Sequence, residues 1–197
     1  MAPGTHPAFH DPAIRAQEIS EAQLKPILEI RRVAAAAGDG AEPAFGLAHP
    51  VHVMGLRELV KGGKVDGTPV AIRVLESRGP QIAAFYDVST SSIAPQVLQT
   101  AGSDSHYASL LERGIDAAAR WAGKREQAHL RLLRIPALHT EALLLRTNGE
   151  KEETAIVVRT PQAGVEMLTP MPLSELVSLL EPAARLILTD DDGRKPS

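Results

Sequence analysis

Two strand-rich stretches separated by an amphipathic helix constrain this chain more than any other feature of its sequence. Strand-forming residues dominate 68–88 and 130–160, and within the first stretch side chains alternate over 70–75 and 82–88 with the period of a strand. Between them, over 104–121, apolar residues recur every three or four positions and form one apolar helix face. We therefore predict an α+β fold of two layers, an antiparallel β-sheet with helices packed on one face.

The length of 197 residues suits one domain that buries most of its apolar surface. Prolines and a glycine fill the first dozen positions, which predicts a flexible N-terminal arm over 1–19. Three consecutive aspartates followed by basic residues predict a flexible tail over 189–197. The sequence thus predicts a single α+β domain over 20–188.

Two further helices are predicted near prolines. Ser20 with Gln23 resembles a capping box, but Pro26 would then interrupt the helix, so we favour a start at Pro26. Pro170 and Pro172 open the last helix, whose apolar stripe we expect to pack on the sheet.

Composition excludes several classes of function. The net charge of −3, with 21 basic and 24 acidic residues, offers no general attraction for nucleic acid, and 3% aromatic residues leave few stacking platforms. The absence of cysteine excludes disulfides, thiolate nucleophiles and cysteine-based zinc sites. We predict no nucleic-acid partner.

The compartment is predicted from the same composition and from the N-terminus. A cysteine-free chain fits a reducing environment, and the first residues lack the basic start and apolar run of a signal peptide. No apolar run approaches the roughly 18 residues that span a bilayer. We predict a cytoplasmic protein that makes no membrane contact.

Histidines and carboxylates suggest a polar cleft between helix and sheet. His139 and Glu141 lie two residues apart in a predicted strand and would share a face, and Asp87 or His106 could join them. His49 and His52 flank Pro50 and Val51, which favour extended backbone that points the two imidazoles to opposite sides. Two ligands do not make a metal site, so we predict neither a metal nor a cofactor.

Hydroxyl chemistry has one candidate position. The run 89–92 follows Asp87 at a strand end, and Ser91 could supply a hydroxyl group for chemistry or help to hold an anion. The run lacks the Gly-x-Ser-x-Gly frame of a nucleophile elbow, and turn formation explains it equally. The adjacent residues 104–106 combine Asp, Ser and His, but neighbours on a helix point in different directions and cannot form a triad.

A glycine pair flanked by lysines is a further candidate for anion binding. Gly62 and Gly63, between Lys61 and Lys64, could offer backbone amides and two cations to a phosphate. The stretch lacks the Gly-x-x-x-x-Gly-Lys frame that opens into a helix, so a plain solvent loop is the alternative.

Three consecutive leucines at 143–145 provide the one indication of a partner. A strand that is apolar on both faces is either central and covered on both sides or an edge used in association, which makes Leu143 and Leu145 candidate partner-facing residues. We expect a noncatalytic binding or assembly module that acts through a protein partner or self-association. The alternative is a small-molecule-binding protein or enzyme with a polar-lined cleft.

Overall fold

The computed structural model describes residues 14–15, 17, 19–36, 44–65, 67–79, 81–90, 98–123, 128–148 and 150–193. The helices are α1 (Glu21–Ala36), α2 (Leu56–Val60), α3 (Ser105–Ala122) and α4 (Leu173–Gly193), with a 3-10 turn at Pro136–Leu138. The strands are β1 (Ile14–Arg15), β2 (Ala44–Val53), β3 (Ala71–Arg78), β4 (Gln81–Ser89), β5 (Leu98–Gly102), β6 (Ala128–Ile135), β7 (Thr140–Arg146), β8 (Thr154–Arg159) and β9 (Pro170–Pro172).

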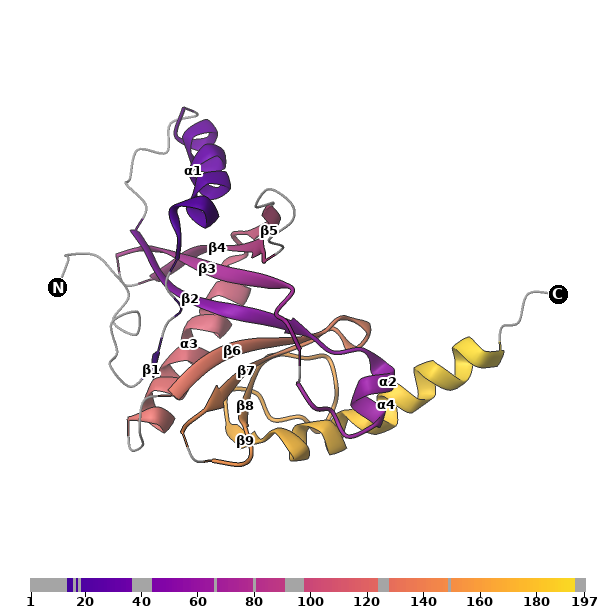
Figure 1. Ribbon diagram of the computed structural model, residues 1–197. Helices are drawn as coiled ribbons and strands as arrows, with labels where there is room; N and C mark the ends of the chain where they lie inside the picture. Colours follow the sequence, from indigo (N-terminus) through magenta and orange to yellow (C-terminus); the bar gives the residue numbers. More distant parts are fainter. Residues whose placement is uncertain are drawn as a thin grey trace.

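The strands form one nine-stranded sheet in the order β5-β4-β3-β2-β6-β7-β8-β9, with β1 paired to β6 (Figure 1). Pairing is antiparallel except where β6 meets β2 and β1 in parallel. The predicted α+β class is therefore confirmed. The alternating stretch 68–88 forms the β3–β4 hairpin, and 130–160 contains three strands.

The sheet consists of two halves with the same internal order. In each half an antiparallel run of four strands, β2 to β5 or β6 to β9, is followed by a long helix, α3 or α4. The halves meet through their first strands, where Val51–Val53 of β2 pairs with Leu132–Arg134 of β6. This junction is short, so the side chains that cross it matter for holding the sheet together.

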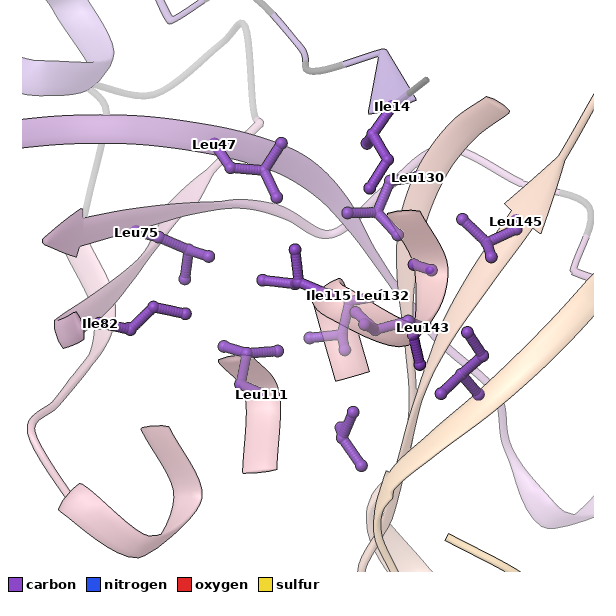
Figure 2. Packing of buried hydrophobic residues seen from close by; sticks show 14 of the residues in the cluster. Ile14, Leu47, Leu75, Ile82, Leu111, Ile115, Leu130, Leu132, Leu143 and Leu145 are labelled. Carbon is purple, nitrogen blue, oxygen red and sulfur yellow. The ribbon is translucent and has the colours of Figure 1, made fainter. Parts of the chain in front are cut away.

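One face of the sheet is covered by α3. Leu111 and Ile115 of α3 are fully buried against a cluster that includes Leu132 and Leu143 from the second half and Leu75 from the first (Figure 2). The apolar spacing of α3 therefore buries its predicted face across both halves.

The opposite face carries the remaining helices. Ile27 of α1 packs with Ile72 and Val74 of β3, while α4 and α2 cover Leu144 of β7 and Val157 of β8. The expected two-layer arrangement with helices on one face is not confirmed, because strands such as β7 are apolar on both sides and need cover on both.

Local signals decide several element boundaries differently from the sequence prediction. The α1 helix begins at Glu21, since Ser20 and Gln23 form the reciprocal hydrogen bonds of a capping box, and Pro26 lies inside the helix. The prolines at 170 and 172 belong to β9, an edge strand where a missing N–H costs little, and α4 begins after them.

The predicted arm and tail are partly built into the fold. Ile14 lies in the arm predicted over 1–19, yet it pairs with β6 and joins the core under α3, while 1–13 lie outside the described residues. The tail predicted over 189–197 begins as helix, because α4 continues to Gly193. None of the helices described is both long and apolar enough to cross a membrane.

Candidate functional site

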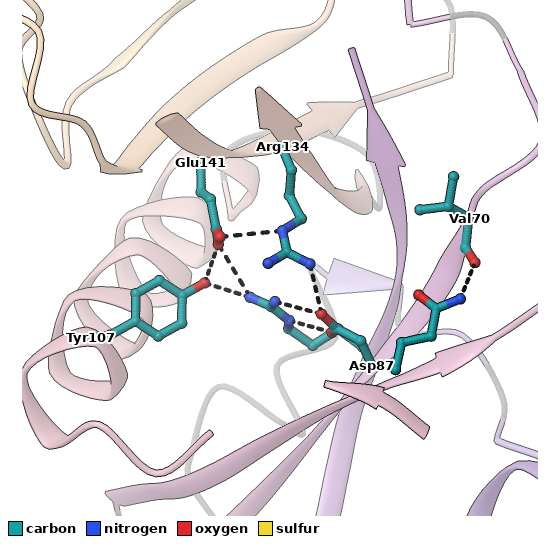
Figure 3. A network of polar contacts seen from close by, with 7 residues as sticks. Val70, Asp87, Tyr107, Arg134 and Glu141 are labelled. Atoms are coloured by element: carbon teal, nitrogen blue, oxygen red, sulfur yellow. Dashed lines mark hydrogen bonds and ion pairs between the residues drawn. The ribbon is translucent and has the colours of Figure 1, made fainter. Parts of the chain in front are cut away.

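A network of charged and polar side chains lies between α3 and the middle of the sheet. It consists of Arg73 on β3, Asp87 on β4, Arg134 on β6, Glu141 on β7 and Tyr107 in the first turn of α3 (Figure 3). These residues come from both halves of the sheet and from the helix that covers them.

Arg73 and Asp87 form the centre of the network. They are direct cross-strand partners, with 2.7 Å from Nε to Oδ1 and 2.9 Å from Nη2 to Oδ2. Both side chains are completely buried, and the guanidinium carbon lies 4.5 Å from the ring centre of Phe85. A bidentate pair stacked on an aromatic ring is the geometry in which a buried arginine is best compensated.

Arg134 connects this pair to the second half of the sheet. Its Nη1 donates to Oδ2 of Asp87 at 3.0 Å, and its Nε lies 3.2 Å from Oε1 of Glu141. The two arginines and two carboxylates thus bridge β4 and β7 across the short β2–β6 junction.

Tyr107 closes the network from the side of the helix. Its hydroxyl donates to Oε2 of Glu141, and Arg73 Nη1 contacts that hydroxyl and lies 3.4 Å from the same carboxylate oxygen. Burial raises the pKa of Tyr107, so the phenol stays neutral and remains a donor. Burial alone would lower the pKa of Arg73, but its bond to Asp87 and the charges around it raise the pKa overall.

His49 lies beside this network on β2, as the cross-strand neighbour of Arg73. The side chain is completely buried, and neither ring nitrogen has a hydrogen-bond partner. Burial and the charge of Arg73 lower its pKa to about 3, which outweighs the opposite influence of Asp87. The imidazole is therefore neutral near pH 7 and is not a proton donor there.

The charges of the network compensate one another. Two guanidinium groups face two carboxylates, and Arg134, with 30% of its side chain exposed, is its most accessible charge. The arrangement can hold β3, β4, β6, β7 and α3 in a fixed relation. A closed set of paired groups of this kind is suited to positioning elements, whereas catalysis needs groups that reach a substrate.

The predicted polar cleft is only partly assembled. Asp87 and Glu141 meet, through Arg73 and Arg134. His106 is exposed in the first turn of α3, and Ser91 lies outside the described residues.

His139 is also exposed, and it lies apart from the cleft. It occupies the left-handed turn that precedes β7, with φ of 49°, instead of sharing a strand face with Glu141.

Leu143 and Leu145 do not offer a surface to a partner. Both side chains are completely buried in the core under α3, because β7 lies between β6 and β8. Of the two interpretations that the leucine run left open, the central strand covered on both sides is the one found. A partner-facing role for these two residues is corrected accordingly.

Sequence reasoning missed Arg73, Tyr107, Arg134 and His49 as members of one buried region. A signal for Arg73 was present: it shares a strand face with Ala71 and Leu75, both buried, and the tight β3–β4 turn places it opposite Asp87. Nothing local indicated that β6 and β7 would join the same sheet, with β2 alone between them and this hairpin.

Metal ligation finds no support within the described ranges, where no group of three or more His, Asp or Glu side chains is placed to hold an ion. His49 and His52 lie on opposite faces of β2, as the extended backbone predicted: His49 is beside Arg73, while burial and Arg131 on the other side lower the pKa of His52. Comparison with protein-family models, with curated proteins and with solved structures finds no match to this chain.

Proposed function

We propose that this chain is a noncatalytic assembly module that associates with a second copy of itself through the end of α4. We call residues 181–190 the α4 tip. In Figure 1 this part of the helix projects away from the sheet, beyond α2. The buried network then serves to hold the body of the module rigid.

The observation that carries the proposal is the apolar surface of the α4 tip. Leu186 is 71% exposed and Ile187 41% exposed, in contrast to Leu176, Leu180 and Ala184 earlier in the helix, which are buried. The buried stripe and Ile187 follow helical spacing, so the stripe continues after the body stops covering it. Covering one leucine or isoleucine is worth about 1.5–3 kcal/mol, which favours a partner at this position.

A second copy of the chain can cover this surface, and no additional binding surface is needed for that. An apolar stripe is complementary to itself, and a two-fold dimer requires only one such patch. Asp190 places a negative charge near the end of α4. Antiparallel pairing keeps these acidic ends apart, whereas parallel pairing would place them together.

Cysteine crosslinking tests this proposal directly, because the chain has no cysteine of its own. We expect Leu186→Cys to form a disulfide-linked dimer under mild oxidation, since the centre of an antiparallel contact lies near the two-fold axis. Ser178→Cys, exposed on the same helix outside the tip, is the matched control and should form no disulfide-linked dimer. Equal crosslinking of the two variants, or none in either, would contradict the proposal.

The alternative of an enzyme with a cleft between helix and sheet has weaker support. Asp87 and Glu141, its two best candidates, are bound by Arg73, Arg134 and Tyr107. A substrate there would have to displace these bonds.

A further inference from the structure

An open pocket of about 460 Å³ lies between three segments of the chain, away from the buried network. It is lined by the loop 62–65 after α2, by residues around the β7–β8 connection, and by Leu173 and Ser174 at the start of α4. Its volume is within the range of pockets that hold small ligands, which is about 300–1,000 Å³.

Three cationic side chains line this pocket, one from the loop after α2 and two from the ends of the β7–β8 connection. Lys64 belongs to the loop, Arg146 ends β7 and Lys151 precedes β8. Within the described part of the chain, none of these three side chains has a hydrogen-bond or ion-pair partner. Three cations that line one pocket and are not paired with its carboxylates attract an anion.

The acidic residues of the pocket are already engaged. Oε1 of Glu152 accepts the backbone N–H of Ser174 at 3.2 Å, and Glu153 binds Arg131. Because Glu152 occupies that N–H at the start of α4, an anion in the pocket would be held by the side-chain cations and not by the helix end.

The loop that carries Lys64 is fixed in place. A Cβ added at Gly63 would lie 2.2 Å from Val177 of α4, so the loop backbone rests directly on the helix, and φ of +60° also requires glycine there. Arg131 Nη1 donates to the carbonyl of Val65 at 3.4 Å. The glycine pair thus acts through close packing, while Lys64 supplies the charge.

We propose that this pocket binds the oxyanion group, phosphate or carboxylate, of a small organic molecule. Lys64, Arg146 and Lys151 pair with the anionic group, and Val65 and Leu173 contact the carbon part of the ligand. This inference does not depend on self-association through the α4 tip.

The test is an NMR titration of the full chain with inorganic phosphate and, separately, with acetate, at constant ionic strength. We expect saturable shifts at the backbone amides of Lys64, Arg146 and Lys151 with at least one anion. Lys64→Gln and Lys151→Gln should each weaken binding about fivefold to tenfold, because each removes a charge-assisted contact. Lys61→Gln, an equal charge change in an exposed residue beside the loop, should leave binding unchanged.

Saturation by phosphate alone or acetate alone identifies the group that the pocket accepts. No saturation with either anion would overturn the proposal. Equal weakening by Lys61→Gln would also overturn it, since diffuse attraction to a basic surface would then explain the binding. All three lysines are exposed, so these variants are expected to fold, and thermal unfolding verifies this.

Discussion

The buried guanidinium group of Arg73 contributes to stability because Asp87 and Glu141 compensate its charge. Replacing it with methionine, which fills a similar volume, leaves Asp87 and Glu141 with one arginine between them. Breaking a buried pair by removing one partner costs about 3–5 kcal/mol. We therefore expect Arg73→Met to lower the free energy of unfolding by about 3 kcal/mol in urea denaturation.

The matched control is Arg57→Met, the same substitution at an exposed position of α2, away from the network and from the α4 tip. Surface substitutions of this kind change the free energy of unfolding by about 0.5 kcal/mol or less. A loss at Arg73 no larger than that at Arg57 would show that the network does not hold the sheet.

His49 gives the protein a predictable dependence on pH. The pKa of His49 in the folded chain is about 3, below the ordinary 6.5. As the pH falls below 6.5, this residue therefore binds a proton in the unfolded chain but not in the folded chain. The stabilisation is complete above that pH and is lost progressively toward pH 3. Between pH 7 and 5 this amounts to about 2 kcal/mol.

The measurement compares urea denaturation of the original chain and of His49→Leu at several pH values. Leucine removes the titrating group and two buried nitrogens without partners, so the variant should be as stable at pH 7 and should lose less stability toward pH 5. Parallel pH curves for the two chains would show that His49 is not the cause.

At the scale of single residues, the sequence indicated individual polar side chains but not the residues that bind them. Asp87 and Glu141 were singled out as polar groups of a possible cleft, yet their arginine partners were not, because the partners come from strands 47 to 68 positions away or from across the hairpin. A pairing of that kind depends on the order of strands in the sheet.

Among the elements, α3 shows how one cap decides where a helix begins. Asp104, and not the preceding Ser103, caps it: its Oδ1 accepts the N–H groups of His106 at 2.9 Å and Tyr107 at 3.2 Å. We expect Asp104→Ala to lower the free energy of unfolding by about 1 kcal/mol. Ser103→Ala should have almost no effect, and the reverse order in thermal or urea unfolding would contradict this assignment.

Elements with a strong local signal were predictable, and those without one were not. The β3–β4 hairpin and β6 follow the alternation of their sequences, while β7 and β8 follow short apolar runs. By contrast, β5 and β9 are short edge-side strands whose residues reveal little by pattern, and β9 contains two prolines. They become strands because a neighbouring strand offers hydrogen bonds.

The whole molecule is organised by one long-range pairing that no local pattern encodes. The parallel contact between β2 and β6 joins two similar halves and places α3 and α4 on opposite faces. The two strand-rich stretches were visible in the sequence, but the order of the sheet was not. The faces that each helix covers follow from that order.

Among the described residues, α1 also exposes apolar side chains, including Leu28 and Val33, the latter by 71%. We assign self-association to the α4 tip because three buried residues, Leu176, Leu180 and Ala184, lead to it at helical spacing, whereas Ile27 is the one buried side chain among those described in α1. A glutamate substituted into the α4 tip or into α1 distinguishes which of the two surfaces associates.

Light scattering coupled to size-exclusion chromatography, with the original chain, Leu186→Glu and Val33→Glu, tests the proposed association most directly. We predict a dimer mass for the original chain and for Val33→Glu, and a monomer mass of about 21.0 kDa for Leu186→Glu. A monomeric original chain, or a dimer that Val33→Glu separates and Leu186→Glu does not, would contradict the proposal.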